Sequence, residues 1–110
     1  MTISAESLIS LCPFVDSPQA LSEAGNDFVL LPNLKITVAG AIHARDGLLC
    51  PQTLHGYLTR LFISEPIPGR GQNWKRYMFF GRPWYSPSWQ GVDATLPFPQ
   101  MLLAHLGAYR

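Results

Sequence analysis

Cys50 is the residue that the sequence places best for nucleophilic chemistry. It directly precedes Pro51, a favourable first residue for a helix, and the apolar spacing that follows predicts a helix there. A thiol at a helix N-terminus has a lowered pKa because the helix dipole stabilises the thiolate. His43 and His55 lie near it in the sequence and could serve as a base or an orienting group. The alternative is a buried Cys50 that packs as a small apolar residue, since no oxyanion-stabilising element is identifiable.

Metal binding is a weaker possibility for the same residues. The spacing of His43, Cys50 and His55 lacks the paired, closely spaced ligands of a standard zinc site. His105 lies in the last predicted helix, where a packed or surface histidine is more common than a ligand. The sequence therefore predicts neither a metal nor a cofactor.

The segment from Arg70 to Trp89 alternates basic with aromatic residues and is the strongest local feature. Such a pattern suits single-stranded RNA, because rings stack on bases while Arg and Lys meet phosphates. Trp, Tyr and Arg are also enriched where proteins bind each other. A core strand with outward charges is the third interpretation. The predicted contact residues are Arg70, Trp74, Lys75, Arg76, Tyr77, Arg82, Trp84, Tyr85 and Trp89.

A glycine-rich loop, Gly69-Arg70-Gly71, opens this segment. It lacks the Lys-Ser/Thr of a phosphate loop and the third glycine of a dinucleotide fingerprint. It is therefore a weak signal for phosphate binding.

Charge is distributed unevenly along the 110 residues, whose net charge is +1. Residues 1–34 hold four acids and no Lys or Arg, which gives −4. Residues 60–110 hold six Lys and Arg and two acids, which gives +4. An anionic partner for the second half, or mutual neutralisation of the two halves, would explain this asymmetry.

No signal peptide and no membrane-spanning run are visible, so we expect a cytoplasmic protein with no membrane partner. The two cysteines form no disulfide framework.

Helices at both ends of the chain and one in the middle are predicted to hold these residues in place. Thr2 can cap a helix over 3–11, and Pro18 and Gly25 bound a second over 18–24. Leu54, Leu58, Leu61 and Phe62 recur at helical spacing, which predicts a helix over 51–63. A last helix follows Pro97 and Pro99 and carries Phe98, Leu102, His105, Leu106 and Tyr109.

Strands are predicted over 28–31 and 34–42, with Gly40 as a bulge, and over 74–80. Residues 45–47 read as a turn, and 81–88 as irregular because prolines interrupt ladder hydrogen bonds. The expected fold is a small single α+β domain. It has a ferredoxin-like or similar sheet of three to four strands (body 28–110) and a helical N-terminal extension (1–25).

Residues 28–36, 39–42 and 51–58 resemble the N-terminal strand and first helix of RAMP-type CRISPR subunits that cap the guide-RNA handle in type I-F complexes. A looser likeness over 34–58 is to the corresponding subunit of type IV systems. The resemblance implies a ferredoxin-like βαββαβ domain that contacts RNA and neighbouring effector subunits. It predicts a non-enzymatic binding protein of prokaryotic defence or counter-defence. This would be a reduced effector subunit or an anti-CRISPR-type inhibitor that docks on a protein or ribonucleoprotein complex.

A second likeness, over 88–93 and 102–106, is to the C-terminal part of prokaryotic ubiquitin-conjugating-like proteins. It implies the alternative function, a small thiol-dependent transfer enzyme that uses Cys50, with His55 nearby. The proline-rich stretch expected ahead of that cysteine is missing.

Overall fold

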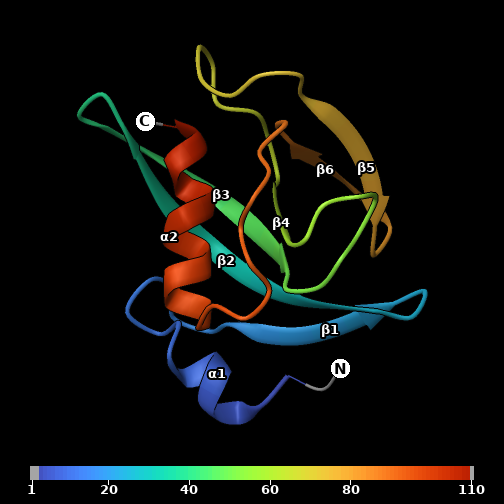
Figure 1. Ribbon diagram of the computed structural model, residues 1–110. Helices are drawn as coiled ribbons and strands as arrows, with labels where there is room; N and C mark the ends of the chain where they lie inside the picture. Colours follow the sequence, from blue (N-terminus) through green and yellow to red (C-terminus); the bar gives the residue numbers. More distant parts are fainter. Residues whose placement is uncertain (1–2, 110) are drawn as a thin grey trace.

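The computed structural model describes residues 3–109, which form one six-stranded antiparallel sheet and two small helices (Figure 1). The sheet has the strand order β1-β2-β3-β4-β6-β5. The predicted ferredoxin-like sheet of three to four strands is therefore wrong. Strands β1 to β4 pair in chain order, β5 and β6 form a separate hairpin that joins β4 through β6, and in this part of the chain no helix connects one strand to the next. The elements are α1 (Ala5–Ile9), β1 (Gln19–Glu23), β2 (Asn26–Val38), β3 (Ala41–Cys50), β4 (Arg60–Ile63), β5 (Lys75–Phe79), β6 (Arg82–Ser86), α2 (Phe98–Leu106) and a 3-10 turn η1 (Gly107–Tyr109).

The first helix is confirmed in a shorter form, and the second is wrong. Ser4 caps α1 by accepting a hydrogen bond from the Ser7 N–H at 3.1 Å. Residues 19–23, predicted as a helix, form β1 and pair with β2. A two-residue turn with positive φ at Ala24 and Gly25 joins the two strands. Gly25 thus closes a hairpin rather than ending a helix.

The strand predicted over 28–31 and most of the one predicted over 34–42 form one long strand, β2, with an irregularity after Leu31, whereas residues 41–42 begin β3. Asn33 lies there with φ +53°, and its N–H donates to Asp46 Oδ1 at 2.9 Å. Gly40 forms the hairpin turn to β3, with φ +81°, and is not a bulge. The turn predicted at 45–47 lies inside β3.

The predicted helix over 51–63 is absent. Residues 60–63 form β4, and all four are buried. Before it, Leu54 and Tyr57 exchange both backbone hydrogen bonds around a turn at His55 and Gly56. A short strand buried on both faces is a continuous apolar run, and its spacing cannot be told from that of a buried helix. The helical half of the RAMP resemblance falls in this segment.

The strand predicted over 74–80 is confirmed as β5, but residues 82–86 form β6 rather than an irregular segment. A turn at Phe80 and Gly81, both with positive φ, closes the hairpin. Pro83 is accommodated opposite Met78. On its other side, β6 meets β4 at one residue pair, Ile63 with Tyr85. The last helix is confirmed as α2.

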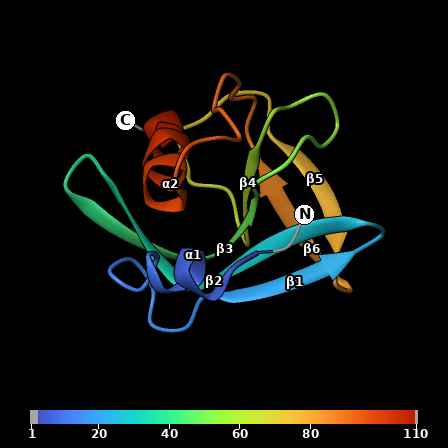
Figure 2. The ribbon, with the colours of Figure 1, turned by 60° about the horizontal axis from the view of Figure 1, so that its bottom comes forward.

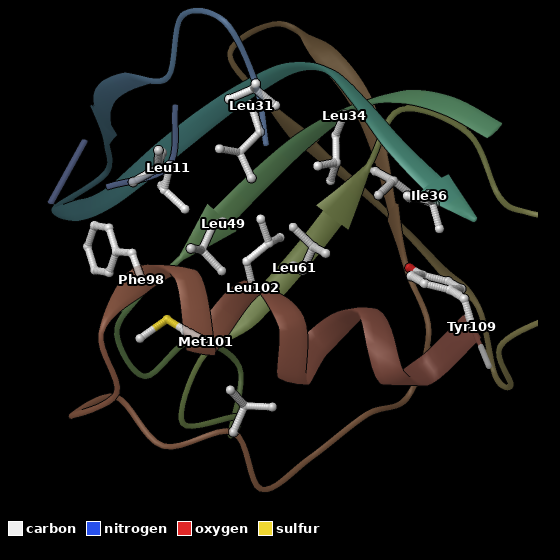
Figure 3. Packing of buried hydrophobic residues seen from close by; sticks show 14 of the residues in the cluster. Leu11, Leu31, Leu34, Ile36, Leu49, Leu61, Phe98, Met101, Leu102 and Tyr109 are labelled. Atoms are coloured by element: carbon white, nitrogen blue, oxygen red, sulfur yellow. The ribbon is translucent and has the colours of Figure 1, made fainter. Parts of the chain in front are cut away.

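Each face of the sheet has its own apolar cluster. Helix α2 lies across β2 and β3 (Figure 1), and its Met101 and Leu102 pack against Leu31, Leu49 and Leu61 (Figure 3). The opposite face holds Phe28, Leu48, Cys50, Leu54, Phe62 and Trp84. The sheet is strongly curled (Figure 2), and a ring of the outer strand β5 reaches a ring of β2. The centroids of Phe28 and Phe79 are 5.0 Å apart.

None of the helices within residues 3–109 is long and apolar enough to cross a membrane.

Candidate functional site

Cys50 is fully buried at the end of β3, in the second apolar cluster. Burial raises the pKa of its thiol to about 11, so the thiol is protonated at neutral pH. The segment after it is not a helix, so no dipole opposes this effect. The sequence had placed Cys50 at a helix N-terminus, and the loss of that helix removes the reason to expect a reactive thiolate.

The two histidines near Cys50 in the sequence do not assemble a catalytic centre with it. His43 and Cys50 lie in the same strand, seven residues apart, which is about 23 Å at the rise of a β-strand. His55 is exposed at the tip of its turn, where its ring stacks on Tyr77 with centroids 5.1 Å apart. Within residues 3–109, no three His, Cys, Asp or Glu side chains lie close enough to hold a metal ion.

The predicted contact segment divides into inward and outward residues. Trp84 is 1% exposed, and its Nε1–H donates to the Phe79 carbonyl at 3.2 Å. Trp74 is half-buried and stacks on Tyr109 of η1. Tyr77 and Tyr85 are also half-buried. Four of the rings predicted to stack on bases are thus committed wholly or partly to packing.

The outward part of the segment is mainly cationic. Lys75 and Arg76 are exposed on β5, and Met78 beside them is 55% exposed. Arg82 is exposed as well, but it pairs with Asp46 at 3.3 Å and lies over the Trp84 ring. In the described part of the chain, neither Lys75 nor Arg76 forms an ion pair. The acidic residues of the first third of the chain therefore do not neutralise Lys75 and Arg76 through ion pairs.

Arg60 is a buried charged residue that the sequence analysis did not identify as a candidate site residue. It is 2% exposed in β4, on the same face as the second apolar cluster. Its Nε–H donates to Ser86 Oγ and its Nη1–H donates to the Tyr77 hydroxyl, each at 3.1 Å. The Tyr57 ring covers the guanidinium at 3.9 Å from the ring centroid. No carboxylate of residues 3–109 pairs with it. Residues 57, 60, 77 and 86 follow no helical or strand periodicity along the sequence, so no local sequence pattern predicts that they form a cluster.

His105 of α2 is buried beside Thr59, behind Arg60. The Thr59 hydroxyl donates to the Val92 carbonyl at 2.9 Å and lies 2.8 Å from His105 Nε2. Because a hydroxyl has one proton, Nε2 must carry a hydrogen and donate it to Thr59. Burial, and then the charge of Arg60, lower the pKa of His105 from 6.5 to about 4. His105 is therefore a neutral packing residue, not a ligand.

We expect this histidine to make the protein acid-sensitive between pH 6.5 and 4. Its folded-state pKa lies below its unfolded value, so the unfolded chain binds more protons in this window and stability falls as the pH falls. The loss attributable to His105 is about 3 kcal/mol at pH 4 and below. Urea unfolding at several pH values measures it. In His105→Gln, an uncharged donor replaces the imidazole, and the pH dependence should shrink by that amount. An unchanged pH dependence would show that His105 is not the cause.

A cavity of about 420 Å³ opens where the loop 69–72 meets residues 88–89 and η1. Its wall holds Arg70, Gln72, Ser88 and Trp89, together with Gly69, Gly71 and Ala108. The Arg70 Nε is buried and has no hydrogen-bond partner in the described chain. Within residues 3–109, the Arg70 guanidinium donates one hydrogen bond, from Nη1 to the neighbouring Gly69 carbonyl at 3.3 Å. Arg70 and Trp89 of the predicted segment thus line a hollow.

A comparison with known proteins finds no family model, no curated protein and no solved structure that matches this chain.

Proposed function

We propose that this chain is a non-enzymatic binding protein that docks a partner protein along the outer edge of β5. The observation that carries the proposal is that β5 is one of the two outer strands of the sheet, with β1 at the other end, and within residues 3–109 it pairs only with β6 (Figure 1). An outer strand has one row of unpaired N–H and C=O groups, onto which an extended segment of a partner can add as a further strand.

The side chains along this edge indicate the chemistry of the partner. Lys75 and Arg76 point to opposite faces of β5, are exposed and form no ion pair within residues 3–109. Met78 adds exposed apolar surface on the same strand. An acidic segment with an apolar residue complements such an edge, because its carboxylates neutralise both cations.

A protein is favoured over single-stranded RNA as the partner. Recognition of unpaired bases needs ring faces open to solvent. Trp84 is buried, whereas Trp74 and Tyr77 are partly buried against Tyr109 and Arg60. Trp89, which is 39% exposed, remains as a stacking ring, so the segment offers RNA a few charges and less stacking surface than its composition predicts.

The resemblance of residues 28–58 supplies the proposed setting, which is prokaryotic defence or counter-defence. Since the chain is a hairpin sheet rather than a ferredoxin-like domain, we favour an inhibitor that docks on a protein or ribonucleoprotein complex over a reduced effector subunit. No contact of the described chain favours the alternative of a Cys50-dependent transfer enzyme, because the thiol is buried and protonated.

Site-specific photo-crosslinking in a bacterial lysate tests the docking edge. A photoreactive phenylalanine replaces Met78 on β5 or, as the control, the exposed Lys35 on β2. We expect a discrete protein adduct from position 78 and none from position 35. Reversing both charges, Lys75→Glu with Arg76→Glu, should reduce the yield of that adduct more than tenfold, whereas Lys35→Glu should leave it unchanged. An adduct that nuclease removes, or one that survives the double reversal, would contradict a charged protein-docking edge.

A further inference from the structure

We propose that the cavity at Arg70 and Trp89 binds a small phosphate ester that carries a flat ring, of which a nucleoside monophosphate is the simplest class. This site is separate from the docking edge, and the inference does not depend on the proposed function. Its volume of about 420 Å³ lies within the range of small-molecule sites, roughly 300–1,000 Å³.

The phosphate is assigned to the end of the cavity formed by Arg70. A guanidinium has five N–H donors, and in the described chain this one uses a single bond of 3.3 Å to its neighbour's carbonyl. Its Nε is buried without a partner, which is costly because a buried donor loses its water and gains nothing. A small turn of the side chain toward the cavity would let an oxyanion bridge Nε and a terminal nitrogen, which would remove this cost through two parallel charge-assisted bonds.

The loop around Arg70 is shaped for a close approach of the ligand. Gly69 and Gly71, on either side of it, have φ of +74° and +77° and line the cavity. Glycine adopts these angles without strain and leaves the backbone N–H groups accessible to an anion. A Cβ on Gly71 would lie 2.9 Å from the Trp74 ring, so the loop tolerates no side chain there.

The flat ring is assigned to Trp89, which lines the same cavity and is 39% exposed. Its Nε1–H donates to the Ala104 carbonyl of α2 at 3.0 Å, so the indole is held by one edge against the helix. Trp89 is thereby fixed beside the cavity, and a second aromatic system can stack on its exposed surface at little entropic cost. Gln72 and Ser88 offer polar side chains, and the Ser88 N–H, which donates to the Gln72 carbonyl at 2.7 Å, joins the two sides of the cavity.

Titration calorimetry and Trp fluorescence with AMP, inorganic phosphate and adenosine test the assignment at low ionic strength. We expect AMP to bind at millimolar concentration or below and more tightly than either fragment. Arg70→Gln should weaken AMP binding by roughly ten- to a hundredfold, the usual effect of losing a hydrogen bond to a charged group. Trp89→Ala should abolish the preference of the site for AMP over inorganic phosphate.

Arg76→Gln is the matched control, because it removes the same charge from an exposed residue of β5 that does not line the cavity. It should change AMP binding less than twofold. The proposal is overturned if AMP does not bind at millimolar concentration, if inorganic phosphate binds as tightly as AMP, or if Arg76→Gln weakens binding as much as Arg70→Gln. Urea unfolding of each variant confirms that the sheet is intact.

Discussion

Trp84→Ala is expected to destabilise the protein by about 4 kcal/mol, which is a large fraction of the roughly 5–15 kcal/mol that stabilises an ordinary domain. Trp84 is 1% exposed and is the largest side chain of the second apolar cluster. Its removal opens a cavity in this cluster and removes the hydrogen bond that the indole donates to the Phe79 carbonyl. Chemical denaturation followed by far-UV circular dichroism measures the loss.

Trp89→Ala is the matched control for this prediction. The same atoms are removed, but Trp89 is partly exposed and contributes one hydrogen bond to α2, so we expect a loss of roughly 1 kcal/mol. Equal losses at the two positions would show that Trp84 is not the centre of the second cluster. If Trp84→Ala unfolds the chain, a loss of binding in that variant says nothing about the contact surface.

Arg60→Ala and Arg60→Met should separate the packing of Arg60 from its charge. The alanine variant removes the stem that packs beneath Tyr57 and empties a buried site, for an expected loss of about 3 kcal/mol. Methionine keeps the stem and discards a buried charge that no carboxylate of the described chain compensates. We expect Arg60→Met to lie within about 1 kcal/mol of the natural protein, because replacing a buried charge by an apolar side chain removes its desolvation cost.

The pKa of His105 supplies an independent readout of this charge. The positive charge of Arg60 is the second cause of the lowered pKa of His105, after burial. NMR titration of Arg60→Met should therefore show a pKa that rises toward 6.5 but stays below it. If Arg60→Met is as unstable as Arg60→Ala, the hydrogen bonds and the ring contact of the guanidinium outweigh its desolvation, and the charge itself stabilises the fold.

The elements that the sequence predicted correctly are those whose signals are local. Helix α2 has an apolar face after two prolines, and β5 is a run of aromatic and large residues. Helix α1 was predicted with a cap at Thr2, which lies outside the described residues, whereas Ser4 caps the shorter helix that forms. The failure over 51–63 has a physical reason, because Leu54, Leu58, Leu61 and Phe62 are apolar at helical spacing yet serve a turn and a strand buried on both faces. Their identity as a strand depends on pairing with β3, which no local window contains.

The missed hairpins share one signal. Four of the turns place a residue with φ near +50° before a glycine with φ near +80°: Ala24-Gly25, Ala39-Gly40, His55-Gly56 and Phe80-Gly81. Asn-Gly and Asp-Gly dipeptides are the usual sequence signals of such turns, because Asn and Asp tolerate positive φ. Here Ala, His or Phe occupies the first position, so the turns lack that signal. The repeated X-Gly dipeptides would have indicated a hairpin sheet in place of a ferredoxin-like domain.

The candidate sites follow the same division. Lys75 and Arg76 were predicted as contact residues from the alternation of basic and aromatic residues in their segment. Both are exposed, because they lie on an outer strand of the sheet. The Arg60 cluster and the cavity at Arg70 and Trp89 are products of tertiary structure. The contacts of Arg60 join residues 17 and 26 positions apart, and the cavity joins the loop 69–72 to residues 88–89 and Ala108, so only the folded chain puts them together.

The single residue pair between β4 and β6 has a consequence for the order in which the sheet assembles. Strands β1 to β3 are consecutive along the chain and are joined by two-residue turns, so their pairing costs little loop-closure entropy. The β5–β6 hairpin must close the loop over residues 64–81 to meet β4, and it gains one backbone pair there. Amide hydrogen exchange should therefore be slowest in β2 and β3 and fastest along the seam between β4 and β6. We expect the native sheet to open first at this seam. Opening would separate the β5–β6 hairpin from β4, and with it Lys75, Arg76 and the two residues, Tyr77 and Ser86, that accept hydrogen bonds from Arg60.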